Sequence, residues 1–358
     1  MNVILANANR PSYGEATIPL PIPRKEYEHS LELLRQMEVG DAVKEDCWVI
    51  GIEGGPPILQ QLKGMVVNID EIDYLAKRLD SFDKRELAAF QGMADAHGLE
   101  KPKDLINLTF SCENVTVVQD FSDLERIGRQ HYMNLNGGYA SAYELEKINA
   151  KKVATDLLTS RGGKITPYGI VYENGAELMQ YYDGRTFPEY LYEEKVLTLE
   201  ISGGEQKSVW LDLPMPDSQI GRMLERGGFS EQDAEFVHVE IDLPNELTDL
   251  LCISNEPIRE LNRMCAAIAE LSGKDIDKLA AAALMAEPET ALQITHLAEN
   301  LDQFDFVPDA RTPGDYGRHM IRESGHFEYD ENLEEFYDYA KYGRQRIQEE
   351  SGEFNKYG

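Results

Sequence analysis

The chain has 358 residues, which is enough for two or three domains. Its apolar content of 42% is that of a globular protein with sizeable cores, and it excludes a chain that is disordered throughout. It carries 65 Asp and Glu against 35 Lys and Arg, a formal net charge of −30. A field of this sign repels nucleic acid and anionic membranes, so the charge favours a basic partner unless it serves only solubility.

The acidic excess is uneven along the chain. Residues 1–180 hold 27 acids and 19 bases, and residues 181–358 hold 38 acids and 16 bases. The second half therefore carries most of the negative charge.

The four cysteines are scattered, and no C-x-x-C pair or His cluster stands at metal-ligand spacing. This pattern is typical of reduced thiols in a cytoplasmic protein. The first residues, "MNVILANANRPSYGE", lack a basic region and a long apolar run, so they predict a strand rather than a signal peptide. No stretch is apolar enough for a membrane span, and no membrane partner is expected.

The first 165 residues predict an alternation of short strands and amphipathic helices. The strand at 2–6 is followed by a second strand that ends at "LPIP" (20–23), whose prolines favour the start of a helix. Apolar residues at helical spacing and a capping box at Asp83 and Glu86 predict helices after that. The expected helices cover 24–37, 68–82, 83–98 and 121–133, and the further strands cover 46–53 and 114–118.

Residues 166–194 are predicted to connect two parts of the chain. Two β-rich runs flank Asn174-Gly175, which is a strong turn signal, so we expect a β-hairpin there. The "ISGGEQK" stretch (201–207) indicates a second hairpin turn rather than a phosphate loop, because no helix follows it directly.

The remaining residues repeat the order of the first part. "LPMP" (213–216) follows "LPIP" at a shift of 193, and Gly317-Arg318 follows Gly128-Arg129 at a shift of 189. Strands are expected at 195–199, in "EFVHVEID" (235–242) and in "QFDFV" (303–307), with helices between them and a helix break near Pro288. Five blocks recur in one order, so the sequence predicts copy 1 at 1–165 and copy 2 at 195–358. The expected class is α+β, with small antiparallel sheets and helical clusters.

The sequence contains no phosphate-binding glycine motif, zinc-protease motif or nucleophile elbow. His319 and Glu323 stand four residues apart on an expected helix, but a metal site would need more ligands. With 65 carboxylates, any one carboxylate pair says little about catalysis. We therefore expect no enzyme, no cofactor and no metal.

The carboxylates can instead be considered as an array. B-DNA carries one charge per roughly 1.7 Å of its axis, so a net charge of −30 corresponds to roughly 50 Å of duplex. Carboxylates set at phosphate-like positions would occupy a basic DNA-binding groove without any bases.

Several stretches of the sequence resemble the ArdA antirestriction family. In copy 2 they are "SNEPIRELNRM" (254–264), "PGDYGRHMIRESG" (313–325), "LEEFYDYAKYGRQ" (333–345) and "GEFNKYG" (352–358). In copy 1 they are "ANANRPSYGEATIPLP" (6–21), "NIDEIDYLAKRL" (68–79) and "DLERIG" (123–128). The resemblance covers most of both copies and is better in copy 2, because "LEKINAKKVATD" (145–156) has lost the aromatic residues and acids.

The resemblance implies an elongated, cytoplasmic DNA mimic, carried on mobile elements such as conjugative transposons. Such a protein occupies the DNA-binding groove of type I restriction–modification enzymes, at the methyltransferase and specificity core. It would need no cofactor and would not bind nucleic acid itself. Members of the family dimerise, so two copies in one chain imply a homodimer or a pseudo-dimer within the chain.

Acids that interrupt the apolar stripes are expected to face solvent and to act as phosphate surrogates. In copy 2 these are Asp305, Asp309, Asp315, Glu323, Glu328, Asp330, Glu331, Glu334, Glu335 and Asp338. Weaker candidates in copy 1 are Asp70, Glu71, Asp73, Asp120, Asp123 and Glu125, although Glu71 and its counterpart Glu260 could instead brace helices. Tyr337, Tyr339 and Tyr342 are expected to pack the acidic segment against the protein.

Two other functions stay open from the sequence. The first is a general acidic binding protein for another basic partner, such as a relaxosome or nucleoid component. The second is an enzyme whose carboxylate site has no recognisable motif. Displacement of DNA from a methyltransferase core would separate the leading function from the first of these. Turnover of a substrate that is lost when one carboxylate pair is removed would favour the second.

Overall fold

The structure is a computed structural model that describes residues 1–358 except 176, 191–194, 203–207, 232–234, 250–252 and 327. The chain divides into two compact units. Unit 1 holds 1–192, 204–210 and 218–230, and unit 2 holds 193–203, 211–217 and 231–358. Within the described residues, no helix is long and apolar enough to cross a membrane.

Unit 1 begins with a four-stranded antiparallel sheet of order β2-β1-β3-β4. Strand β1 pairs with β2 on one side and β3 on the other, and alternate residues such as Val3 and Leu5 are buried. Helix α1 adds Leu31 and Leu34 to the same core. The bounds are β1 Asn2–Ala6, β2 Glu15–Pro19, α1 Tyr27–Gln36, β3 Cys47–Glu53 and β4 Val66–Val67.

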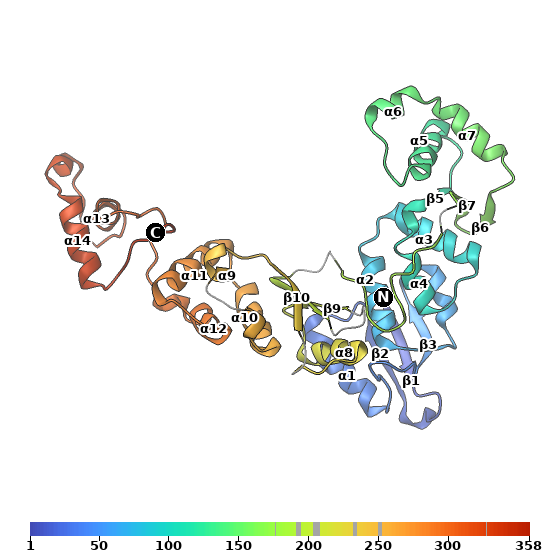
Figure 1. The fold of residues 1–358 in the computed structure, drawn as a ribbon, viewed down its shortest axis with the longest axis horizontal. Helices are drawn as coiled ribbons and strands as arrows, with labels where there is room; N and C mark the ends of the chain where they lie inside the picture. Colours follow the sequence, from blue (N-terminus) through green and yellow to red (C-terminus); the bar gives the residue numbers. More distant parts are fainter. Residues whose placement is uncertain (176, 191–194, 203–207, 232–234, 250–252, 327) are drawn as a thin grey trace. The chain divides into compact units, whose positions relative to one another are not determined.

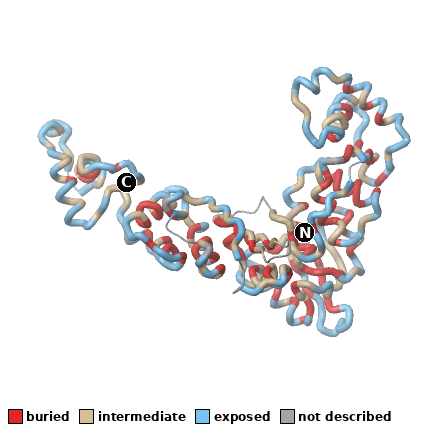
Figure 2. Tube along the Cα trace, viewed as in Figure 1, coloured by how far each residue is buried: buried red, intermediate tan, exposed pale blue. Residues whose placement is uncertain are grey.

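Three helices continue this core. Helix α2 begins at the Asn68 cap, whose side chain accepts the backbone N–H groups of Asp70 and Glu71. The predicted capping box of Asp83 and Glu86 starts α3, which ends at the left-handed Gly98. The bounds are α2 Ile69–Asp80, α3 Lys84–His97 and α4 Pro102–Leu108. In Figure 2, buried positions recur along the sheet and these helices.

The last part of unit 1 is a three-stranded sheet of order β5-β7-β6 beside a helix pair. Helices α5 and α7 pack so closely that a Cβ on Gly128 would lie 1.8 Å from the carbonyl oxygen of Ala150. Glycine is therefore needed where the two helices cross. The bounds are β5 Val115–Val118, α5 Leu124–Leu135, α6 Ala142–Lys147, α7 Ala150–Thr159, β6 Lys164–Thr166 and β7 Gly169–Glu173.

The predicted hairpin around Asn174-Gly175 is wrong. The turn lies at 167–168, between β6 and β7, and β5 occupies the other edge of β7. Because both edges of β7 are taken, the residues after 174 have no strand to pair with on β7. They pack on the α2 region instead, where the ring of Phe187 stacks on those of Tyr74 and Tyr182.

Unit 2 contains most of a three-stranded sheet of order β10-β8-β9. The predicted strands at 195–199 and 235–242 correspond to β8 and β10. The predicted turn in 203–207 lies outside the described residues. The bounds are β8 Leu197–Ser202, β9 Ser208–Leu213, α8 Asp217–Gly227 and β10 Glu235–Ile241. Of these, residues 208–210 of β9 and 218–227 of α8 belong to unit 1.

Helices form the rest of unit 2. The predicted break near Pro288 separates α11 from α12. The strand predicted at 303–307 is not formed, and a 3-10 turn over Leu301–Gln303 leads into irregular backbone there. The bounds are α9 Asn245–Asp249, α10 Ile258–Ala269, α11 Gly273–Ala286, α12 Ala291–Glu299, α13 Pro313–Arg322 and α14 Tyr339–Glu349.

Helices α13 and α14 form a second close pair, drawn orange to red in Figure 1. A Cβ on Gly317 would lie 2.0 Å from the carbonyl oxygen of Tyr339, and one on Gly343 would lie 1.8 Å from that of Pro313. Both glycines are therefore required by the crossing. Mixed helices and small antiparallel sheets in both units confirm the expected α+β class.

Candidate partner-binding surface

An acidic segment of unit 2, residues 313–353, contains α13 and α14 and holds eleven Asp and Glu against five Lys and Arg. Seven of these acids and none of these bases fall within residues 323–338. A short 3-10 turn, η7 (Glu331–Phe336), stands between the two helices. This segment contains eight of the ten acids predicted for copy 2, and we call it the acidic helix pair.

Most of the predicted acids in unit 2 face solvent. Asp315 and Glu334 are half-buried. The exposed ones are Asp305, Asp309, Glu323, Glu328, Asp330, Glu331, Glu335 and Asp338. Exposure leaves these carboxylates accessible to a partner, and it does not by itself assign them one.

Several of these acids also hold local structure. The side chain of Asp338 caps α14 by accepting the backbone N–H of Lys341 at 3.0 Å, and Asp330 caps η7. Asp315 accepts the hydroxyl of Thr312 at 2.6 Å in the first turn of α13. Neutralising these three would therefore disturb the fold as well as the charge.

Glu328, Glu331 and Glu335 differ from the capping acids. In the part of the chain that the structure describes, their side chains make no hydrogen bond or ion pair, and all three are exposed. They are the carboxylates best suited to a test of charge alone.

Glu334 interacts with a cluster of aromatic and basic side chains. The hydroxyl of Tyr329 donates to Glu334, which lowers the pKa of that carboxyl, and Arg322 lies 3.6 Å from it. The ring of Tyr337 lies 5.8 Å from those of both Tyr329 and Tyr339. Tyr342 packs on Ala310, Tyr316 and Met320. The expectation that Tyr337, Tyr339 and Tyr342 pack this segment is therefore confirmed.

In unit 1, the expected solvent-facing role of Asp70 and Asp73 is wrong. Asp73 is buried and accepts the backbone N–H of Ile22 at 2.6 Å. Asp70 pairs with Arg222, whose nitrogen lies 2.9 Å from the carboxylate and whose other donors reach backbone carbonyls. Both acids hold the fold, because their partners come from segments far away in sequence.

Glu71 is also buried, and it braces α2. This is the alternative role that the sequence left open for Glu71 because Glu260 recurs at the matching position. Burial raises the pKa of its carboxyl, which accepts the hydroxyl of Tyr182 at 2.7 Å. The same hydroxyl accepts a hydrogen bond from the buried guanidinium of Arg226 in α8. Tyr182 thus links the acid to the base, and Glu71 is not a phosphate surrogate.

Asp120, Asp123 and Glu125 are exposed as predicted, but each has a local partner. Asp120 accepts the backbone N–H of Ser122, and Asp123 caps α5. Glu125 pairs with Lys151 at 3.5 Å.

The helix pair α5–α7 in unit 1 has the opposite charge to the acidic helix pair. Residues 124–164 hold seven Lys and Arg against four Asp and Glu over the same length of chain. The acidic helix pair therefore carries a net negative charge, and the α5–α7 region carries a net positive one.

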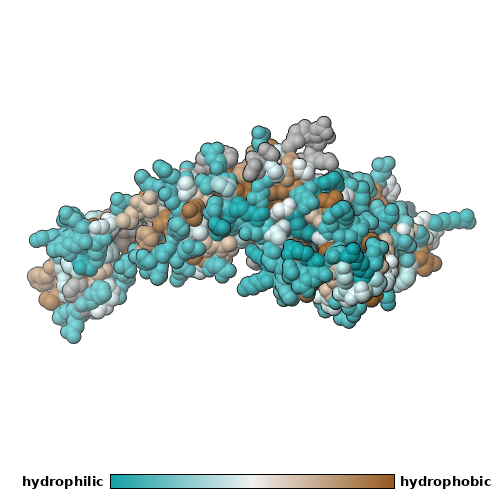
Figure 3. Space-filling model, turned by 90° about the horizontal axis from the view of Figure 1, so that it is seen from below, coloured by the Kyte–Doolittle hydropathy of each residue, from teal (hydrophilic) through white to brown (hydrophobic). Residues whose placement is uncertain are grey.

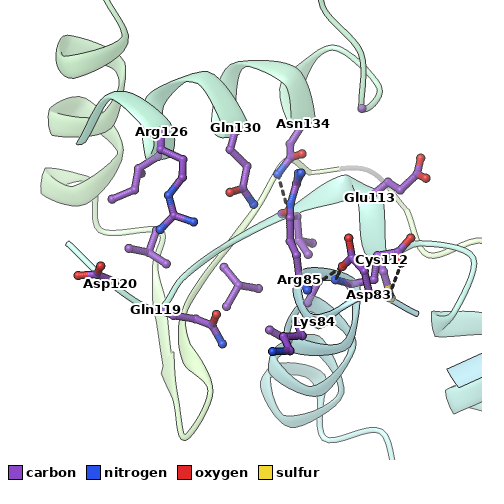
Figure 4. Close-up of a pocket in the computed structure, with 18 residues that line it drawn as sticks. Asp83, Lys84, Arg85, Cys112, Glu113, Gln119, Asp120, Arg126, Gln130 and Asn134 are labelled. Carbon is purple, nitrogen blue, oxygen red and sulfur yellow. Dashed lines mark hydrogen bonds between the residues drawn. The ribbon is translucent and has the colours of Figure 1, made fainter. Parts of the chain in front are cut away.

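A polar cleft of about 400 Å³ lies between α3 and α5 (Figure 4). Arg126, Gln130 and Asn134 from α5 face it from one side, and Lys84 and Arg85 from the first turn of α3 lie on the other. Acidic and basic side chains are mixed along the cleft, and most of them are exposed to solvent. Its lining residues do not bring together a general acid, a general base and a nucleophile in the arrangement that a catalytic site needs. Over the described residues there is also no group of three possible metal ligands.

Hydrophilic side chains cover most of the face of the molecule seen in Figure 3. Exposed large apolar side chains are the exceptions, and two of them, Leu333 and Phe336, belong to η7. The sequence analysis did not predict that the aromatic side chain of Phe336 faces solvent.

No curated protein and no solved structure matches this chain. One protein family does match it, over the residues that contain the acidic helix pair. Residues 202–358 match the family model described as antirestriction protein (ArdA), so the carboxyl-terminal part of the chain is similar to that family.

Proposed function

We propose that this protein is an antirestriction protein that acts as a DNA mimic. Its acidic helix pair would occupy the DNA-binding groove of a type I restriction–modification enzyme, at the methyltransferase and specificity core. The observation that carries the proposal is that the residues matched to the antirestriction family contain a dense run of mostly exposed acids, seven within 323–338 with no Lys or Arg among them. The mechanism needs no catalysis and no cofactor.

Electrostatics explains how such a surface would compete with DNA. A basic groove gains affinity for DNA mainly from phosphate contacts and from release of counterions. Exposed carboxylates offer the same contacts, and their field accelerates encounter with a basic partner. Binding should therefore be steeply salt-dependent and spread over many acids.

We further propose that residues 1–165 are a second, diverged ArdA-like copy, which would make the chain a pseudo-dimer. Three parallels support this. Strand β1 lies between β2 and β3 as β8 lies between β9 and β10. The backbone N–H of Ile22 donates to Asp73, and that of Met215 donates to Asn262. The third parallel is that both helix pairs cross at glycine.

The test is displacement of a labelled recognition duplex from a type I methyltransferase core. The wild-type chain should displace the duplex at low salt, and its affinity should fall steeply as salt is raised. A triple variant Glu328→Gln, Glu331→Gln and Glu335→Gln should weaken displacement by about tenfold, at about 0.5 kcal/mol for each of the three exposed contacts.

The matched control carries the same change in charge elsewhere. Glu26, Glu53 and Glu100 are exposed acids of unit 1, and replacing them with Gln should leave displacement within about twofold of wild type. Equal losses in both triple variants would indicate only a general effect of net charge, and a general acidic binding protein would become the better description.

A further inference from the structure

Two exposed apolar side chains stand inside the acidic helix pair. In η7, Phe336 has 81% of its surface exposed and Leu333 has 47%. Glu331 and Glu335 are exposed on the same short turn. An exposed phenylalanine ring gives up the free energy that burial would provide, so such a ring often marks a contact with a partner.

Side chains packed against η7 hold the turn that carries Phe336. Tyr329 and Arg322 hold Glu334, and the rings of Tyr329 and Tyr339 each lie 5.8 Å from that of Tyr337. Phe336 takes no part in these ring contacts. A ring presented from a fixed turn loses little conformational freedom on binding, which is the condition for an efficient anchor.

The helix pair of unit 1 shows that the fold does not need an aromatic residue here. Asn149 caps α7 as Asp338 caps α14, at a sequence interval of 189 residues. At the same interval, Lys147 stands where the acidic helix pair has Phe336. A similar capped helix pair therefore forms with a charged residue at this position, so folding of the pair does not require an aromatic side chain at 336.

The combination of an exposed ring and surrounding carboxylates specifies the partner. Carboxylates bind favourably in a basic groove, and a projecting aromatic ring binds favourably in an apolar pocket within that groove. Enzymes that modify a base inside a duplex have such a pocket, because they turn the target base out of the stack and hold it between apolar or aromatic side chains. A phenyl ring is flat and of a similar size to a base.

We infer that Phe336 is a nucleobase surrogate, which enters the base-binding pocket of the methyltransferase while the surrounding acids occupy phosphate positions. Leu333 would pack against the rim of the pocket. This inference rests on the proposed function and adds to it one discrete anchor within a surface whose charges act collectively.

Loss of the anchor should weaken binding without changing its electrostatics. Truncation of an aromatic anchor that fills a pocket is among the most costly changes at an interface, so Phe336→Ala should weaken binding to the methyltransferase core at least tenfold. The slope of affinity against salt should stay at the wild-type value, since no charge changes. Phe336→Trp should retain most of the affinity.

The experiment measures binding of the full chain to two basic proteins. One is a type I methyltransferase core, and the other is a helix-turn-helix DNA-binding domain, which reads DNA with its bases stacked. Phe336→Ala should lose at least tenfold with the first and less than twofold with the second. Phe121→Ala removes another exposed phenylalanine, in unit 1, and should change neither value.

Each contrary result has a distinct meaning. Unchanged binding of Phe336→Ala to the methyltransferase overturns the anchor but leaves the proposed function in place. Equal losses with both proteins overturn the base-pocket assignment. A wild-type dimer in sedimentation velocity that dissociates in Phe336→Ala would assign the ring to a second copy of the chain instead. If the wild-type chain fails to bind the methyltransferase at all, the proposed function fails and this inference falls with it.

Discussion

Arg226 provides the sharpest test of how unit 1 is held together. Only 2% of its surface is exposed, although it carries a full charge. Its guanidinium donates to the carbonyl oxygens of Ala42 at 2.5 Å and Arg185 at 2.6 Å, and to the side chain of Asn68 at 3.0 Å. It therefore joins α8 to the loop before β3, the cap of α2 and the segment after β7.

We expect Arg226→Met to lower the free energy of unfolding of unit 1 by about 3 kcal/mol. Two carbonyls lose a charged donor, at about 1 to 3 kcal/mol each. The contact of the guanidinium with the ring of Phe187, 4.4 Å from its centroid, contributes about 2 kcal/mol more. Burial of the methionine side chain and removal of the desolvation cost of the charge offset part of this loss.

The assay is urea unfolding followed by tryptophan fluorescence. Both tryptophans, Trp48 and Trp210, belong to unit 1, so the signal reports on that unit. Arg161→Met, at an exposed position of the same unit, is the matched control and should change the free energy by less than about 0.5 kcal/mol. A loss below about 1 kcal/mol in Arg226→Met with an unchanged urea dependence would refute this reasoning.

Two further outcomes follow from local geometry. Gly317→Ala should separate α13 from α14, and hydrogen exchange should show that pair destabilised by about 2 to 4 kcal/mol. The same variant should no longer displace DNA. Gly314→Ala on the same helix is the control and should have none of these effects, because its added Cβ meets only Thr312 at 3.7 Å. Lys44 and two backbone N–H groups lower the pKa of Asp41 to about 2, so this carboxylate stabilises the fold above about pH 4 and loses that contribution as the pH falls toward 2. Asp41→Asn should therefore cost about 1 kcal/mol at pH 7, after discounting for solvent, and nothing near pH 2; a constant difference at both pH values would contradict this.

The local structure of this protein could largely be predicted from its sequence. Apolar spacing predicted α1, α2 and α3, and short-range capping signals such as Asp83 with Glu86 placed a helix start correctly. These signals depend on residues three or four positions apart, so they need no knowledge of the fold. The strand predicted at 303–307 failed because a strand needs a neighbour, and none lies beside these residues among those described.

Burial of charged side chains could not be predicted in the same way. Asp70, Glu71 and Asp73 interrupt an apolar stripe, as solvent-facing residues do, but their partners lie 152, 111 and 51 residues away. A carboxylate becomes buried only when such a distant donor satisfies it. The exposure of Phe336 was missed for the converse reason, because aromatic residues within a helical segment usually pack inward.

A hydrogen-exchange footprint on a type I methyltransferase core would test the central claim most directly. The enzyme is measured alone, with a duplex that contains its recognition site, and with this protein at saturating concentration and low salt. If the acidic helix pair imitates DNA, the peptides of the enzyme that the duplex protects should also be protected by the protein, and Gly317→Ala should remove that protection. Protection at a different surface, or none at all, would contradict mimicry of DNA.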